Sequence, residues 1–365
     1  MGIATKLSIA FIAITTFIAA LFFLSSPFVS RVDQFPHVYE KPACHSPHND
    51  TPDCLRIIAE NMAMQKDLKG ALDFAVERIA PYNRSALHWT VHTVGHTAYK
   101  LLGDRQAALG LLPENAFSEN RYLIYEGYVH GVFMAYFAEY IKDTPVDDLV
   151  KESCGQFYSE AITPEDPSWR AGRQCFHGVG HALMYALKNQ TQEALKVCER
   201  IPPWVRGNCA FGVFMELAYL YSPHYDPFSP KPDVYGESIA PFCKTAETFK
   251  KQCYMFIGRS YLNLHPHDYK GAFRSCGEDE PSGSDCRYEL ARIEITNPDD
   301  GVSTMKKRCL DAGPAHTLEC FVTVAATLKM GNAGEAYRET DFCGILDTEF
   351  KEQCYKGVSA FKSPY

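Results

Sequence analysis

The sequence predicts an all-α protein built from α/α helical-hairpin repeats, with one short-range disulfide per repeat and a transmembrane helix at the N-terminus. Three observations lead to this prediction. Cysteines recur in pairs about ten residues apart, a seven-residue motif recurs about every 34 residues, and a long apolar run lies near the N-terminus. We expect the repeats to stack as a solenoid, either open or closed into a toroid.

The first element is an apolar run from Leu7 to Leu24, preceded by Lys6 and followed by Arg31. Its length reaches the roughly 18 residues of a membrane-spanning helix and exceeds the core of a cleaved signal peptide. We therefore expect an uncleaved signal anchor with a cytoplasmic N-terminus; a cleaved signal peptide is the alternative. The predicted segments are a cytoplasmic tip with the anchor (1–30), an extracytoplasmic linker (31–53) and the repeat domain (54–365).

The fourteen cysteines all lie beyond this apolar run. The short Cys-x2–4-Cys spacing of most zinc-binding motifs is absent, so the cysteines indicate a disulfide framework. Such a framework places the domain in an oxidising compartment: the lumen of the endoplasmic reticulum or Golgi, the cell surface or the periplasm. The predicted disulfides are Cys44–Cys54, Cys154–Cys175, Cys198–Cys209, Cys243–Cys253, Cys276–Cys286, Cys309–Cys320 and Cys343–Cys354. Sequons at Asn49, Asn83 and Asn189 permit glycosylation in a eukaryotic host.

The repeats become visible when the chain is aligned on the second cysteine of each pair. We expect the motif to open one helix, for example from Cys253 to Leu264, with a turn and a shorter helix behind it that ends at the next cysteine. An antiparallel helix hairpin brings two such cysteines within disulfide distance. The third motif position falls at Arg56, His92, His130, His177, Phe211, Met255, Tyr288, Val322 and Lys356.

In period and in its pattern of small residues, this repeat resembles the tetratricopeptide and Sel1-like helical repeats. The resemblance covers roughly residues 54–365 but lacks the full tetratricopeptide pattern of Trp, Leu, Gly, Tyr and Pro. It implies a helical-hairpin fold and no specific activity.

Glycine recurs within the motif helices, as at Gly95, Gly131, Gly180 and Gly212. Glycine weakens a helix by up to about 1 kcal/mol. Two interpretations stay open: the glycines permit close approach of neighbouring helices, or they leave room for a ligand over the backbone.

Composition restricts the partners. The net charge is −8 and no long basic run occurs, so we expect no nucleic-acid partner. Apolar residues make up 46% of the chain, enough for a continuous core. The expected partners are the membrane, through the N-terminal helix, and a protein or peptide in the concave groove of the repeats.

Five of the thirteen histidines occupy equivalent motif positions in three neighbouring repeats. A His-x3-His pair places both imidazoles on one helix face, the geometry in which helices hold metal ions. Later repeats carry apolar or aromatic residues at the third position, so packing alone does not require histidine there. The predicted metal ligands are His92, His96, His130, His177 and His181.

Two more residues lie four positions before these histidines: Glu126 before His130 and His88 before His92. We expect Glu126 to be a ligand or general base and His130 a ligand or catalytic acid–base group, while His88 is a further ligand or an outer partner. Glu216 and Arg259 could line the same surface as the histidines, but the favoured expectation for both is exposure to solvent. The ligand types predict a divalent transition metal, namely zinc, iron or copper.

Helix spacing sets a condition on this site. Neighbouring helices of a solenoid pack about 10 Å apart, which places His92 and His177 about 20 Å apart. One ion would then require tight curvature, with His130 between the two.

The resulting functional hypothesis is a metal-dependent enzyme, either an oxidoreductase or a hydrolase. No His-Glu-x2-His motif is present, which disfavours a zincin protease. The alternatives are a non-enzymatic scaffold for protein interactions and a metal storage or delivery protein.

Overall fold

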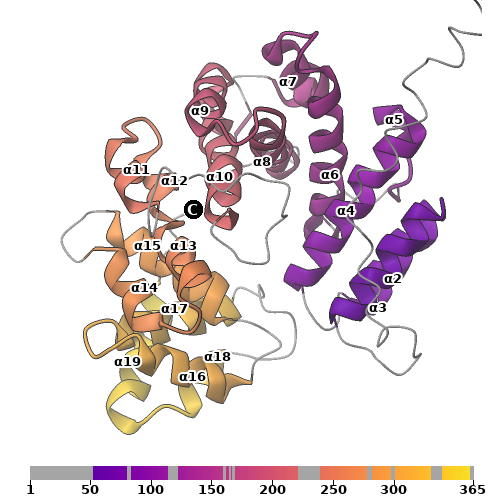
Figure 1. Cartoon of the computed structure of the whole chain (residues 1–365). Coiled ribbons are helices and arrows are strands. Elements are labelled where there is room, and N and C mark those ends of the chain that lie inside the picture. Colours follow the sequence, from indigo (N-terminus) through magenta and orange to yellow (C-terminus); the bar gives the residue numbers. More distant parts are fainter. Residues whose placement is uncertain are drawn as a thin grey trace, which may run out of the picture. The chain divides into compact units, whose positions relative to one another are not determined.

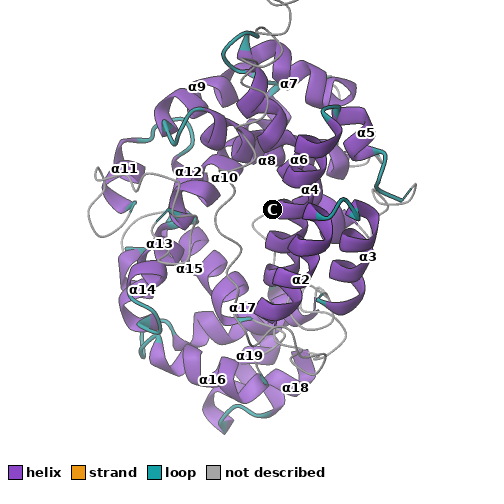
Figure 2. Ribbon diagram, turned by 45° about the vertical axis from the view of Figure 1, so that its right-hand side comes forward, coloured by secondary structure: helices purple, strands orange, loops and turns teal. Residues whose placement is uncertain are grey.

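The computed structural model describes residues 52–79, 84–113, 122–158, 162–163, 166, 169–220, 239–277, 282–296, 301–329 and 339–361. Its contacts divide the chain into Met1–Asn49 and Asp50–Tyr365, and the described residues all belong to the second unit. Within the described residues the chain forms helices and no strand, which confirms the predicted all-α class. The arrangement is shown in Figures 1 and 2.

The helices of the first half alternate between long and short. Three long helices, α4, α6 and α8, contain the histidine motifs. Each long helix packs against the next along the series α4, α6, α8 and α10. The helices are α2 (Pro52–Met64), α3 (Leu68–Arg78), α4 (Arg84–Leu102), α5 (Arg105–Leu109), α6 (Tyr122–Tyr140), α7 (Val146–Cys154), the 3₁₀ turn η4 (Gly155–Phe157), α8 (Trp169–Ala186), α9 (Thr191–Arg200) and α10 (Pro203–Tyr219).

The second half consists mostly of shorter helices. They are α11 (Ala240–Thr245), α12 (Lys250–Tyr254), α13 (Ile257–Leu264), α14 (Tyr269–Ser275), α15 (Gly283–Leu290), the π-helical turn η5 (Ala291–Ile295), α16 (Val302–Asp311), α17 (Thr317–Lys329), α18 (Glu339–Gly344) and α19 (Thr348–Ala360). The helix expected from Cys253 to Leu264 is divided into α12 and α13 near Met255, where the Phe256 amide bonds to the Cys253 carbonyl in a tighter turn.

Local sequence explains where several helices begin. Asp67, Asp104 and Asp268 each accept a hydrogen bond from the backbone amide three residues further on, at the starts of α3, α5 and α14. Such a cap satisfies one of the amides that a helix start leaves free and stabilises the helix by about 1 kcal/mol. The start of α10 has Pro203 at its first position, where the missing amide hydrogen costs nothing.

Six predicted disulfides are present in the structure, with Cα–Cα distances of 5.3 to 5.9 Å. Each joins one helix or its C-terminal cap to the helix that follows: α7 to α8, α9 to α10, α11 to α12, α14 to α15, α16 to α17 and α18 to α19. The seventh pair involves Cys44, which lies outside the described residues. The disulfides close loops of 10 to 21 residues, and in a chain-entropy model each such loop adds about 2 to 3 kcal/mol of stability. The framework identifies an oxidising extracellular or lumenal compartment.

Two apolar cores fill the unit. The first extends from α2 to α15 and encloses the histidine motifs; the second extends from α13 to α19. None of the described helices has the length and apolarity needed to cross a membrane. The predicted anchor, Leu7–Leu24, lies outside the described residues, and so does most of the linker 31–53. The stacking of the repeats as a solenoid stays a prediction.

Candidate metal centre

Five histidine rings from three helices lie together in the first core: His88 and His92 of α4, His130 of α6, and His177 and His181 of α8. Ring centroids are 5.6 Å apart for His88 and His92, 5.7 Å for His92 and His130, 4.9 Å for His130 and His181, and 4.7 Å for His177 and His181. We call this group the histidine cluster. It contains four of the five predicted ligands, and His88 is the fifth member.

The separation expected between the first and third histidine helices was wrong. The rings of His92 and His181 have centroids 5.7 Å apart, and His130 contacts both of them. The estimate of about 20 Å assumed ordinary helix spacing and left out the reach of the side chains, whose rings converge; in addition, α4 and α6 pack closely. The His130 ring lies between the histidines of α4 and those of α8, as expected for a single shared site.

Glycines explain the close approach. A Cβ atom added at Gly131 of α6 would overlap the carbonyl oxygen of His92 on α4, and one added at Gly95 would overlap the carbonyl oxygen of Tyr128. The same reciprocal contact joins α8 and α10, where Gly180 lies on the Cys209 carbonyl and Gly212 on the His177 carbonyl. Of the two interpretations of these glycines, close helix approach is therefore confirmed at these positions.

Substituting alanine for Gly131 is expected to destabilise the protein by about 2 kcal/mol, because α4 and α6 must separate to admit the methyl group. The gain in helix propensity, up to about 1 kcal/mol, offsets only part of this cost. Urea unfolding of the two proteins measures the difference. Gly155→Ala is the control, since nothing lies within 4 Å of an added Cβ there. Equal stability of the Gly131 variant and wild type would contradict the close contact.

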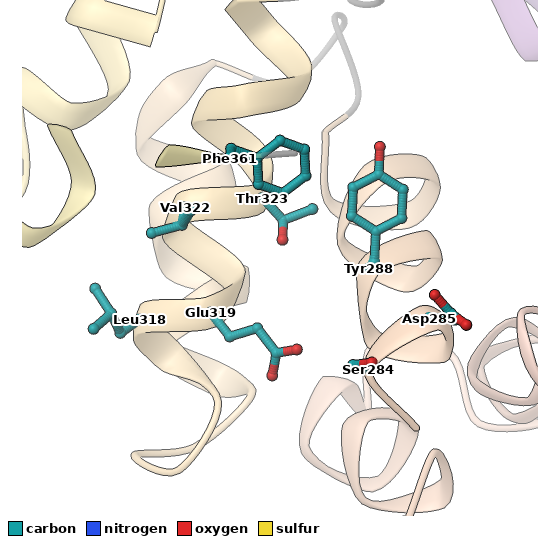
Figure 3. A pocket seen from close by; sticks show the side chains of 8 residues that line it. All are labelled: Ser284, Asp285, Tyr288, Leu318, Glu319, Val322, Thr323 and Phe361. Carbon is teal, nitrogen blue, oxygen red and sulfur yellow. The ribbon is translucent and has the colours of Figure 1, made fainter. Parts of the chain in front are cut away.

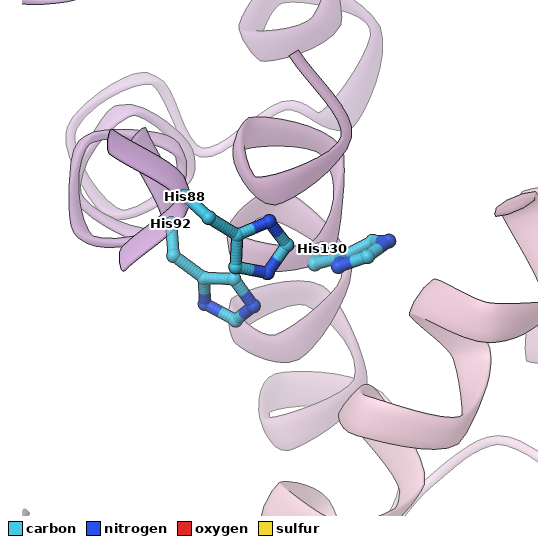
Figure 4. A group of neighbouring side chains, drawn as sticks. All are labelled: His88, His92 and His130. Atoms are coloured by element: carbon cyan, nitrogen blue, oxygen red, sulfur yellow. The ribbon is translucent and has the colours of Figure 1, made fainter. Parts of the chain in front are cut away.

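Three members of the cluster converge as metal ligands do (Figure 4). His88, His92 and His130 each present one nitrogen, and the three nitrogens lie within 4.8 Å of one another. Nε2 of His88, Nε2 of His92 and both ring nitrogens of His130 are buried without a hydrogen-bond partner in the described structure. Leaving a buried nitrogen unpaired costs about 1 to 3 kcal/mol. A metal ion at about 2.1 Å would give one nitrogen of each of the three rings a partner after a small inward rotation of the rings.

Carboxylate and amide groups orient the outer nitrogens of the cluster. Nδ1 of His88 lies 3.4 Å from Oε1 of Glu126, and Nδ1 of His181 lies 2.5 Å from Oε1 of Glu216. Nδ1 of His177 lies 3.2 Å from Oε1 of Gln174. A group that accepts the proton of one ring nitrogen turns the other nitrogen into a lone-pair donor, which is how outer partners prepare metal-ligating histidines.

The structure places the remaining predicted residues as follows. Glu126 contacts His88 on the neighbouring helix, so it reaches the cluster through an outer nitrogen. The His96 ring has its centroid 5.7 Å from that of Tyr185, and His96 is not one of the three residues whose ligand atoms converge. The exposure to solvent expected for Glu216 and Arg259 was wrong. Glu216 is only 2% exposed and bonds His181, while Arg259 is ion-paired with Glu294 at 3.0 Å and lies over the Tyr219 ring.

One feature of the sequence identifies Glu216 in retrospect. It is the only acidic residue in the apolar stretch from Ala210 to Leu220. A charged residue within a buried helix face requires a partner. Its position in α10 therefore indicates a basic or hydrogen-bonding group on the helix packed against it, and His181 of α8 is that group.

Burial sets the protonation of the histidines. Desolvation, followed by the charges of neighbouring histidines, lowers the pKa of His92, His130 and His177 well below the usual value. Desolvation, with a smaller effect of Lys100, lowers the pKa of His96 to about 4. At neutral pH these rings are uncharged, which is the form that binds metal ions.

Acid is expected to destabilise the metal-free protein through these rings. Their unfolded pKa is about 6.5 and their folded pKa is lower, so the unfolded chain binds more protons between the two values. The free energy of unfolding is therefore unaffected by these histidines above about pH 7. It falls from about pH 6.5 toward pH 4, by about 1.4 kcal/mol per pH unit for each such histidine. Denaturant unfolding at each pH, in the presence of a chelator, measures the slope. His96→Phe should reduce the slope; an unchanged slope would contradict the assignment for His96.

Cavities elsewhere do not belong to this centre. One cavity of about 470 Å³ lies between α15 and α17, where Tyr288, Glu319 and Phe361 form part of its wall (Figure 3). Another, of about 170 Å³, is lined by Tyr99 and Arg105 among others. No histidine lines either cavity, so neither contains the chemistry of the cluster.

Comparison with models of known families, with curated proteins and with solved structures found no match to this chain. The likeness to tetratricopeptide and Sel1-like repeats therefore stays one of period and residue pattern, and the histidine cluster is the feature on which a function can be argued.

Proposed function

We propose that this protein is a metal-dependent enzyme of an oxidising compartment, and that His88, His92 and His130 hold its metal ion. The observation that carries the proposal is the convergence of three imidazole nitrogens within 4.8 Å, in a core where those rings have nitrogens without any other partner. A buried histidine that serves packing alone is expected to find a hydrogen bond. Metal binding accounts for the convergence of the three nitrogens and for their lack of hydrogen-bond partners.

The donor set favours zinc, iron or copper. All three donors are imidazoles, and the cysteines of the described structure are all in disulfides, so thiolate ligands are not offered. Neutral imidazole suits these three metals, whereas calcium prefers oxygen ligands. Three histidines that leave a fourth place open match the arrangement of catalytic zinc sites. This favours a hydrolase, while iron or copper at the same ligands would support an oxidoreductase.

The side of the centre at His88 and Glu126 is the one nearest solvent. Their side chains are 13% and 16% exposed, whereas His130 and His181 are fully buried. A bound ion there would activate a water molecule or polarise a carbonyl group. Glu126, which contacts His88, would orient that ring and accept a proton on this side of the centre, as expected of a general base.

The protein would act on the lumenal or outer side of a membrane, held there by the apolar run Leu7–Leu24. Six disulfides support the compartment, and the length of the run supports the anchor. A second candidate function, metal storage or structural metal binding without catalysis, is favoured by the complete burial of His130. A peptide partner bound along the repeats is the non-metal alternative.

Metal analysis of the purified full-length chain tests the proposal, with disulfides intact and no affinity tag. We expect at least one ion per chain, and one ion fewer in the double variant His88→Ala/His92→Ala. His265→Ala, a histidine of the second half whose ring contacts Tyr261, is the control and should keep the ion. A metal-free wild type whose stability the double variant leaves unchanged would contradict metal binding. Retained metal without metal-dependent turnover of ester, amide or phosphate substrates would favour storage.

A further inference from the structure

The second histidine pair of the cluster has a geometry of its own. His177 and His181 lie four residues apart on α8, so their rings share one face, and their Nε2 atoms are 3.0 Å apart. His177 is 8% exposed and His181 is fully buried. Two imidazole nitrogens at this distance require a proton or a metal ion between them, because two lone pairs repel each other.

Hydrogen bonds at the other nitrogens show where the ring protons are. Oε1 of Glu216 lies 2.5 Å from Nδ1 of His181, and a carboxylate only accepts hydrogen bonds, so Nδ1 carries the proton. The amide oxygen of Gln174 faces Nδ1 of His177 at 3.2 Å and accepts in the same way. With both Nδ1 atoms as hydrogen-bond donors, the two Nε2 atoms present lone pairs to each other, and a metal ion can bind both.

We propose that a second metal ion binds between Nε2 of His177 and Nε2 of His181, beside the ion held by His88, His92 and His130. This inference rests on the proposed function for the first position and makes the centre dinuclear. Ligand nitrogens of a tetrahedral ion at about 2.1 Å lie roughly 3.4 Å apart, close to the 3.0 Å observed. Glu216 and Gln174 are the outer partners that orient the two ligands.

His130 makes the two positions neighbours. Its ring centroid is 4.9 Å from His181 and 5.0 Å from His177 on one side, and 5.5 Å from His88 and 5.7 Å from His92 on the other. Two ions held side by side can bind both the attacking and the leaving oxygen of a displacement reaction, which is the advantage of dinuclear hydrolases. The second position has two protein ligands against three, so it leaves more places for water and substrate.

Titration of the chelator-stripped, full-length chain with Zn²⁺ alone tests the second position. Calorimetry and metal analysis should show two ions per chain, with the second bound more weakly because it has fewer protein ligands. His177→Ala should remove the weaker step and His92→Ala the tighter one. Gln174→Leu should weaken only the second step, by about 10- to 100-fold, since it removes an outer partner and no ligand. His265→Ala should keep both steps, and far-ultraviolet circular dichroism verifies that each variant is folded.

The outcomes separate this inference from the proposed function. A single ion that His92→Ala removes and His177→Ala retains would overturn the second position and leave the first intact. A single ion that both variants remove would show one shared site and would also overturn the dinuclear centre. Absence of any bound ion in the wild type would overturn both proposals.

Discussion

His130→Ala is expected to lower the affinity of the first position for Zn²⁺ by more than about 100-fold. His130 supplies one of three converging nitrogens, and loss of an outer partner alone typically costs 10- to 100-fold. The effect of His130→Ala on the free energy of unfolding should differ between the metal-free and the metal-bound protein. In the metal-free protein, the cavity left by the ring is offset by removal of two unpaired buried nitrogens, so the net change is small.

With metal present the two proteins diverge. A ligand that binds only the folded state stabilises it by about 2.7 kcal/mol at a concentration 100 times its Kd, and the variant should lack this gain. Urea unfolding with a chelator and with excess Zn²⁺ measures both states. The matched control is His96→Ala, which removes a half-buried histidine of α4 that lies outside the converging group, and it should keep the zinc effect. An equal zinc effect in His130→Ala and wild type would exclude His130 as a ligand.

The disulfides were predictable because they depend on separation along the chain. A spacing of ten or eleven residues spans the end of one helix and the start of the next, and the structure confirms this for pairs such as Cys309–Cys320. The clustering of histidines followed from the same register, since His92, His130 and His177 occupy equivalent positions in consecutive long helices. The period of a repeat predicts such clustering, because it determines which residues lie on the same face of successive helices.

Distances between helices could not be predicted in the same way. They depend on which face of each helix meets its neighbour and on how closely the backbones pack. Gly131 lies on the His92 carbonyl, and this contact brings α4 and α6 nearer than ordinary side chains allow. The burial of Glu216 depends on the orientation of α10 against α8, so its bond to His181 appears only in three dimensions. The same holds for Arg259, whose partner Glu294 lies in the π-helical turn η5.

Glu216→Ala is expected to destabilise the metal-free protein by about 3 kcal/mol or more. Glu216 is 2% exposed and His181 is fully buried, so the variant leaves the Nδ1 proton of His181 without its acceptor in an apolar core. Breaking a buried pair by removing one partner costs about 3 to 5 kcal/mol, far more than the loss of a surface pair. Denaturant unfolding in the presence of a chelator measures this cost without a contribution from bound metal.

Two control variants identify the cause. Glu216→Gln keeps an oxygen that can accept the Nδ1 proton, so it should recover much of the lost stability. Glu193→Ala removes a carboxylate of α9 whose pair with Lys196 is solvent-exposed, and it should change stability by less than about 1 kcal/mol. If Glu216→Ala is as mild as Glu193→Ala, the bond to His181 does not support the core.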